Sequence, residues 1–247
     1  MDRLQLDKNA KLTGRVYFKD EVMWLGLSGS GASFTFDGTK LVLKLKGDNI
    51  AVGDNPIDYA RIAVYVDGKR VVDEMIDCAE KEVTVIDRTE SAQSVVEIIK
   101  LSESPMSAVG IEAFAEGSAE ALPEKPLKIE FIGDSITCGY GVDDEDENHQ
   151  FTTATEDVTK AYAYKTAKAL DAEYSMFSAS GYGIISGYTE GDEPISEQTI
   201  PQFYCSYGFS RGNFAGTAPQ DIPWDFSKYV PQIIVINLGT NDDSYCR

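Results

Sequence analysis

A Gly-Asp-Ser turn follows a short apolar segment near the middle of the chain. Ser135 stands just beyond segment 128–132, with Asp134 before it. If that segment is a parallel strand, the serine lies at its carboxyl end, where open α/β sheets bind ligands. The positive end of a following helix would stabilise an alkoxide there. Ser135 is therefore a candidate nucleophile, although the same pattern is also typical of a serine that caps a helix.

Two further segments end in residues suited to the same chemistry. Asn241 lies in a Gly-Thr-Asn-Asp sequence after the apolar run 233–236, and an asparagine amide there can donate to an oxyanion. Gly181 follows segment 173–179, and a glycine lets a backbone N–H approach a reacting carbonyl closely. Because parallel strands end at one edge of a sheet, we expect one crevice with a nucleophile and two donors.

The composition excludes several other classes of site. Lys plus Arg number 22 against 41 Asp plus Glu, a net charge of −19, which argues against binding to nucleic acid or to an anionic membrane. The single histidine, His149, excludes HExxH zinc sites and three-histidine metal sites within the chain. No run of 18 apolar residues is present, so we expect no membrane span. No metal or organic cofactor is expected.

Signals for the cellular compartment are few. The first residues, MDRLQLDKNAKL, lack the apolar core of a signal peptide, which predicts a cytoplasmic protein; secretion stays open if the N-terminus has been trimmed. The cysteines form no C-x-x-C pair, so we expect reduced thiols, with one or two disulfides as the alternative for an exported protein. They are Cys78, Cys138, Cys205 and Cys246.

The first 116 residues are typical of short strands between turns. Leu41, Leu43 and Leu45 alternate with lysines, the pattern of a half-buried strand. Residues 62–66 and 71–72 flank Asp-Gly, which predicts a hairpin, and a second Asp-Gly turn is expected at 37–38. Further strands are expected at 23–27, 32–36, 82–86, 95–101 and 109–115. Many short strands at this spacing predict a β-sandwich of the jelly-roll kind over residues 1–120, followed by a linker at 116–127.

The second part of the chain, residues 121–247, has the pattern of an α/β domain with a parallel sheet. Strands are expected at 128–132, 173–179 and 233–236, and a helix from Glu156 to Ala172 with Thr155 as its N-cap. Between the last two strands lies an irregular connection, 184–232, which carries five of the nine prolines. Such long connections are usually functional loops.

These motifs resemble a known family. The sequences FIGDSITCGYGV and WDFSKYVPQIIVINLGTND, with Gly181 between them, are similar to the first three sequence blocks of the SGNH (GDSL-type) hydrolases. The β-rich segment ahead of them resembles carbohydrate esterase family 2, whose members are bacterial deacetylases of plant polysaccharides such as acetylxylan. The resemblance covers most of the chain, and it implies a flavodoxin-like α/β/α SGNH-hydrolase domain behind the sandwich.

The resemblance also implies roles for individual residues. Ser135 would attack the acyl carbonyl and form an acyl-enzyme. The backbone N–H groups of Ser135 and Gly181, with the Asn241 amide, would form the oxyanion hole. Asp134 would brace the nucleophile turn, and Asp242 would be structural. The implied substrate is an O-acetylated oligo- or polysaccharide, with no cofactor; which polysaccharide and which oligomeric state are not predicted.

The family pattern continues with an Asp-x-x-His block, whose histidine is the general base, and this chain ends at Arg247 without it. The hydrolase domain is therefore expected to be partial and the activity of this chain impaired, with 233–236 left as an edge strand. His149 lies in the acidic stretch 143–149, and we expect a solvated loop there rather than a replacement base. The rival interpretation is a non-catalytic carbohydrate-binding or scaffold protein with a remnant hydrolase domain.

Aromatic residues near these motifs could hold a sugar. Trp224 and Tyr182 are the candidate substrate-binding residues, with Tyr140 and Tyr188 as further members of a stacking platform. Aromatic side chains in such loops are as often packing residues. Cys138, three residues after the serine, is expected to be buried and inert, because no histidine partner accompanies it.

Overall fold

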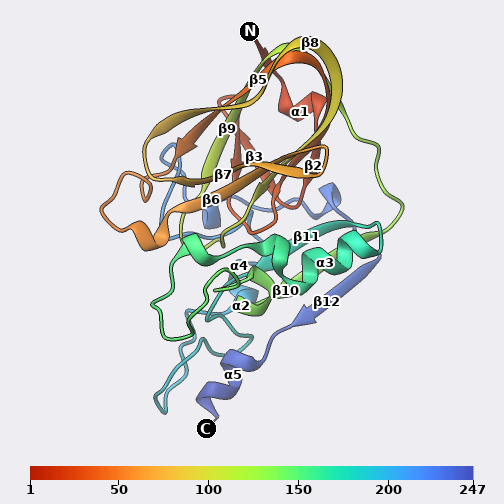
Figure 1. Ribbon diagram of the computed structural model, residues 1–247. Coiled ribbons are helices and arrows are strands. Elements are labelled where there is room, and N and C mark those ends of the chain that lie inside the picture. Colours follow the sequence, from red (N-terminus) through yellow and green to blue (C-terminus); the bar gives the residue numbers. More distant parts are fainter. Residues whose placement is uncertain (247) are drawn as a thin grey trace.

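The computed structural model describes residues 1–246, and these fold into two sheets (Figure 1). Nine antiparallel strands of the described residues form one sheet, coloured red to yellow-green, and three parallel strands form the other, coloured green to blue. Antiparallel pairing in the first half and parallel pairing in the second agree with a β-rich segment followed by an α/β segment, and the sandwich arrangement of the first segment stays a prediction. The jelly-roll connectivity and the domain boundary at residue 120 stay predictions.

The larger sheet has the strand order β3-β4-β9-β5-β8-β6-β7, with β1 paired to β9 and β2 to β5. Its elements are β1 (Asp2–Leu4), α1 (Leu6–Asn9), β2 (Lys11–Thr13), β3 (Val16–Lys19), β4 (Val22–Leu25), β5 (Gly31–Gly47), the 3₁₀ turn η1 (Pro56–Asp58), β6 (Ala60–Val66), β7 (Lys69–Ile76), β8 (Glu80–Lys100) and β9 (Val109–Ala121). The long strands β5, β8 and β9 form its centre.

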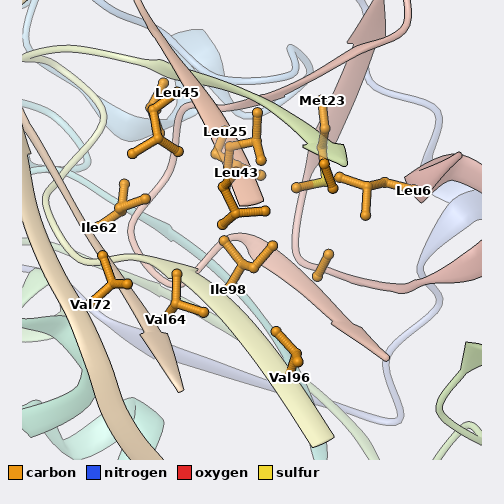
Figure 2. Close-up of a cluster of buried hydrophobic side chains, with 14 of the residues drawn as sticks. Leu6, Met23, Leu25, Leu43, Leu45, Ile62, Val64, Val72, Val96 and Ile98 are labelled. Carbon is orange, nitrogen blue, oxygen red and sulfur yellow. The ribbon is translucent and has the colours of Figure 1, made fainter. Parts of the chain in front are cut away.

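Alternating apolar residues build the core of this sheet. Leu41, Leu43 and Leu45 of β5 are fully buried, as the period-two pattern predicts. Figure 2 shows side chains of β4, β5, β6 and β8 meeting in a single interior, among them Leu25, Leu43, Ile62, Val64 and Ile98. Burying each such side chain contributes roughly 1.5–3 kcal/mol. Residues from strands far apart in the sequence therefore stabilise one another.

Three expected features of this half are wrong, and one turn is confirmed. Asp-Gly 67–68 joins β6 and β7 as a hairpin, with positive φ at both residues. Asp-Gly 37–38 makes no turn, because β5 passes straight through it and pairs with neighbours on both sides. A β-carbon on Gly38 would lie 2.3 Å from the Glu116 carbonyl oxygen, so this glycine serves a close strand approach at a bulge. Likewise, 82–86 and 95–101 belong to one strand, β8, and residues 116–121 extend β9 instead of forming a linker.

The smaller sheet has the order β11-β10-β12. Its elements are β10 (Lys128–Gly133), α2 (Ser135–Cys138), the 3₁₀ turns η2 (Thr153–Thr155) and η3 (Val158–Lys160), α3 (Tyr162–Ala169), β11 (Glu173–Ser178), α4 (Ile200–Phe203), η4 (Pro219–Asp221), η5 (Phe226–Lys228), β12 (Ile233–Asn237) and α5 (Thr240–Tyr245). The three strands lie within one or two residues of their predicted ranges. Ala163 and Ala167 of α3 are fully buried against Ile129 and Phe131 of β10.

The predicted helix over 156–172 is shorter, and its predicted N-cap, Thr155, is wrong. The helix α3 begins at Tyr162 after Ala161, and Thr155 ends a 3₁₀ turn. Asp157 is fully buried and accepts a hydrogen bond from Arg70 of β7 at 2.7 Å. The neighbouring Glu156 is also fully buried. These acids are held by tertiary contacts with the larger sheet, which no helical pattern encodes.

The described residues contain no helix long and apolar enough to span a membrane. All four cysteines are free in the structure.

Among residues 1–246, β12 pairs with β10 on one side only, as expected, and it is apolar. Ile234 and Ile236 alternate onto one face, with 53% and 62% of their surfaces exposed. Exposed apolar edge strands promote pairing between molecules. We predict that replacing both residues by lysine lowers self-association, because charge on an edge opposes strand pairing. Sedimentation velocity over a range of protein concentrations measures the effect.

Leu170 gives the matched control, because it is 53% exposed but follows α3 instead of lying on an edge strand. Leu170→Lys is expected to leave self-association unchanged. An equal reduction by Leu170→Lys would show that general surface charge, and not the β12 edge, sets the association.

Candidate active site

The nucleophile turn is built by Asp134. β10 ends at Gly133, and the Asp134 carboxylate accepts a hydrogen bond from the Ile136 N–H at 3.1 Å as the N-cap of α2. Ser135 is the first residue of α2, so the alternative that it caps the helix is wrong. A β-carbon on Gly133 would lie 1.9 Å from Thr137 Oγ1, so only glycine allows α2 to fold back this closely. Ser135 is half-buried, and its hydroxyl makes no hydrogen bond to another described residue.

The parallel register places the three predicted site segments together. Gly133 lies opposite Ser178 of β11 and opposite Asn237 of β12. Ser135, Gly181 and Asn241 follow these three positions within a few residues, so all three leave the same edge of the sheet. This is the edge where α/β folds bind ligands. The structure therefore brings the predicted nucleophile and both predicted donors to one place.

A direct hydrogen bond ties two of these segments. Asn241 is buried, and its Nδ2 donates to the Tyr182 carbonyl oxygen at 2.8 Å. An asparagine amide carries two N–H donors, so one remains for a second acceptor. Gly181 has φ of +79°, the left-handed conformation that favours glycine, and open space lies where a β-carbon would point.

Asp242 holds the loop that follows Gly181. Its carboxylate accepts backbone hydrogen bonds from Ile184, Ile185 and Ser186 at 2.6–3.1 Å. Burial acts to raise the pKa of Asp242, but these hydrogen bonds outweigh it, and the pKa lies below its usual value. The contacts agree with the structural role expected for this residue.

The two predicted substrate-binding aromatics lie in different places. The half-buried Tyr182 ring packs on Phe203 and Phe209, close to the strand ends. The ring centroid of Trp224 lies 5.2 Å from Cζ of the Arg15 guanidinium. Arg15 is fully buried and reaches Glu130, in the middle of β10. These contacts put Trp224 beside the middle of the strand and Tyr182 beside its end; sugar binding by either stays a prediction.

Neither His149 nor the remaining aromatics complete a catalytic set with Ser135. His149 Nδ1 lies 2.8 Å from Asp144 Oδ1 in an exposed loop, with 65% of the side chain accessible. Tyr140 stacks on Phe151, and Tyr188 is exposed. The contacts of His149 agree with the expected solvated acidic loop.

A buried cluster of ionisable side chains beside the nucleophile turn has no signal in the sequence. Glu103, Cys138, Glu156 and Lys100 are all fully buried. Burial raises the pKa of both glutamates and of the Cys138 thiol, and it lowers the pKa of Lys100 to about 8. Cys138 is thus buried, as predicted. Its sulfur and the glutamate oxygens lie within 4.8 Å of one another, close enough for a cation, but Lys100 already places a positive charge in this cluster.

We predict that Asp242→Ala loosens the loop at residues 184–186. Removing the acceptor leaves three backbone N–H groups without their partner, at a cost of about 1 kcal/mol or more. Amide hydrogen exchange at these positions should accelerate. Because the pKa of Asp242 is lowered, the same stabilisation is lost in the wild type as pH falls through that value.

Asp192→Ala, which changes an exposed aspartate in the same connection, is the control and should leave exchange at 184–186 unchanged. Unaltered exchange in Asp242→Ala would contradict the holding role of this carboxylate.

We predict that Glu156→Gln reduces the pH dependence of stability. Burial favours the protonated carboxyl, so the contribution of Glu156 to stability is greatest below the ordinary glutamate pKa and is lost as pH rises through the raised value. Each unit of that shift corresponds to about 1.4 kcal/mol. Glutamine does not ionise, and its amide oxygen can still accept from the Glu103 N–H. Urea unfolding at pH 5 and pH 8 measures the difference.

Glu120→Gln, at an exposed position of β9, provides the control and should preserve the wild-type pH dependence. If stability depends on pH in the same way in Glu156→Gln and the wild type, ionisation of Glu156 does not contribute to that dependence.

Comparisons with known proteins agree with this geometry. Residues 12–126 match the family model described as carbohydrate esterase 2 N-terminal. A cellulase/esterase, CelE, of Acetivibrio thermocellus is 34% identical over 88% of this chain and 24% of its own length. An acetylxylan esterase / glucomannan deacetylase of Cellvibrio japonicus is 29% identical over 96% of this chain and 62% of its own length. The chain thus spans less than two thirds of either curated relative.

Solved structures give the same result. A family two carbohydrate esterase from Clostridium thermocellum, in complex with cellohexaose, has a TM-score of 0.77 at 29% identity, over 94% of this chain and 66% of that one. A family two carbohydrate esterase from Cellvibrio japonicus has a TM-score of 0.80 at 25% identity, over 97% of this chain and 67% of that one. The family model, both curated relatives and the solved structures point the same way: residues 12–126 match the N-terminal domain of carbohydrate esterase family 2, and the chain is similar to family two carbohydrate esterases over most of its length.

Proposed function

We propose that the site is that of a serine esterase that removes O-acetyl groups from carbohydrate. The observation that carries the proposal is the register of Gly133 with Ser178 and Asn237, which gathers Ser135, Gly181 and Asn241 at one sheet edge. A hydroxyl beside several N–H donors is the arrangement that acyl transfer requires.

The chemistry follows from these positions. Ser135 Oγ attacks the acetyl carbonyl carbon and gives up its proton to a base. The carbonyl oxygen becomes an oxyanion and accepts from the backbone N–H groups of Ser135 and Gly181 and from the second N–H of Asn241. The sugar oxygen leaves with a proton, and water then releases acetate from the acylated serine. Preorganised donors of this kind are worth about 10²–10³ in rate for each donor.

Among the described residues, no histidine contacts Ser135, because the only histidine of the chain is bound to Asp144. We propose that this chain therefore turns over slowly, with the oxyanion donors and substrate binding supplying most of its rate. A hydrolase site without its base keeps about 10³–10⁴-fold acceleration over water.

The names of the relatives support a carbohydrate substrate. An acetylxylan esterase / glucomannan deacetylase and a carbohydrate esterase bound to cellohexaose are both similar over nearly the whole of this chain. We propose an acetylated β-linked plant polysaccharide as the substrate class. Tyr182, whose backbone carbonyl oxygen accepts from Asn241, is the proposed sugar-facing aromatic.

A second candidate function is binding of carbohydrate without catalysis. The free Ser135 hydroxyl, with no base among the described residues, favours this alternative. Calorimetric titration with cello-oligosaccharides, together with acetate release, separates the two: binding with no release of acetate supports the binding protein.

We predict that acetylated xylo-oligosaccharides release acetate slowly in the presence of this chain, and faster when imidazole is added as an exogenous base. Ser135→Ala should abolish both the slow and the imidazole-assisted release, because the acyl acceptor is gone. Acetate is measured by an enzyme-coupled assay, and the rate with imidazole alone is subtracted.

Ser227→Ala is the matched control, since Ser227 is an exposed serine of the turn η5. Its rates should equal those of the wild type. Equal rates for Ser135→Ala and the wild type would remove Ser135 as the nucleophile.

A further inference from the structure

One buried carboxylate reaches both loops of the candidate site from the half of the chain that carries the larger sheet. Glu103 lies between β8 and β9 and is fully buried. Its Oε2 accepts a hydrogen bond from the Ser180 N–H at 2.6 Å, and the Cys138 sulfur lies 3.8 Å from the same oxygen. Ser180 directly precedes Gly181, and Cys138 ends the helical turn that Ser135 begins.

The backbone of Glu103 is itself held on both sides. Its N–H donates to Glu156 Oε2 at 2.9 Å, and its carbonyl oxygen accepts from Lys100 Nζ at 3.0 Å. Lys100 also donates to the Ser102 carbonyl oxygen at 2.6 Å. Because both partners are fully buried, the Glu103 carboxylate has a fixed position before any substrate binds.

A carboxylate is a costly way to fill this space. Burying a charge requires hydrogen-bond partners, and an apolar side chain of similar volume would need none. The two donors that face the Glu103 carboxylate, Ser180 N–H and Cys138 S–H, both belong to segments of the candidate site. The other oxygen, Oε1, has no partner among the described residues. The contacts of the carboxylate therefore serve the site segments and not its own sheet.

We propose that Glu103 is a positioning residue for acyl transfer, which fixes the Gly181 oxyanion loop against the nucleophile helix. The inference rests on the proposed function for its catalytic consequence. The Ser180 N–H determines how the next peptide plane is oriented, and that plane carries the Gly181 N–H. Without the carboxylate, the Gly181 N–H is no longer held in one orientation. The Ser135 turn keeps its own N-cap, Asp134.

The test compares Glu103→Ala and Glu103→Gln in the full chain. Alanine removes the acceptor, whereas glutamine keeps an amide oxygen that can accept from Ser180. In Glu103→Ala, amide exchange at Ser180 and Gly181 should accelerate about tenfold or more. The kcat for imidazole-assisted acetate release should fall about tenfold or more, with KM unchanged, because an oxyanion donor acts in the transition state. Glu103→Gln should restore both to near wild-type values.

Asp48→Ala is the matched control. Asp48 is also a buried carboxylate of the first half, but it accepts hydrogen bonds from Ser107, Ala108, Ile50 and Ala51 and contacts neither site loop through them. Loss of the Asp48 carboxylate should lower the free energy of unfolding, but it should not selectively accelerate amide exchange at Ser180. If Glu103→Ala does not fold, Glu103→Leu replaces it in the comparison. Leucine keeps a similar side-chain volume but lacks the hydrogen-bond acceptor.

The outcomes separate this inference from the proposed function. Equal exchange at Ser180 in Glu103→Ala and Asp48→Ala, or no restoration by glutamine, would overturn the positioning role. Absence of acetate release from the wild type would overturn the proposed function, and amide exchange would then decide the positioning role alone.

Discussion

The alignment of three parallel strand ends is the constraint on which the rest of the site depends. Gly133 lies beside Ser178 and Asn237, and each of these positions leads within a few residues into a site segment. A shift of one residue in either ladder would turn every side chain of that strand to the opposite face. The apolar faces of β10 and β11 fix the register, because Phe131 and Met176 pack in the same buried cluster.

The larger sheet helps to hold that alignment. Ala63, Ile99 and Leu101 belong to the same buried cluster as Ile129 and Phe131, so the two sheets share a core. Arg61 and Arg70 of this sheet also bind Asp143 and Asp157, in the segment between the nucleophile turn and α3. Glu103 extends this support to the oxyanion loop. The family model that matches residues 12–126 covers this supporting half of the chain.

The sequence predicts local features whose cause is local. Strands β10, β11 and β12, the hairpin at 67–68 and the Ser135 turn follow from apolar runs and Asp-Gly or Gly-Asp-Ser patterns. The sequence pattern does not predict features that contacts between distant residues determine. The 37–38 turn fails because β5 has partners on both sides, and the helix start fails because Asp157 pairs with Arg70. The Glu103 cluster joins residues from three separate segments, and no spacing rule connects them.

The central claim is that Ser135 is the nucleophile of a site assembled at the sheet edge. Peptide mass spectrometry after treatment with a fluorophosphonate in the presence of imidazole tests it directly, since imidazole supplies a base for the serine proton and the oxyanion donors hold the phosphonyl oxygen of the stable adduct. The account predicts one adduct, on the peptide that contains Ser135, and none there in a Ser135→Ala variant. Adducts spread over tyrosines and lysines, with Ser135 unmodified, would contradict it.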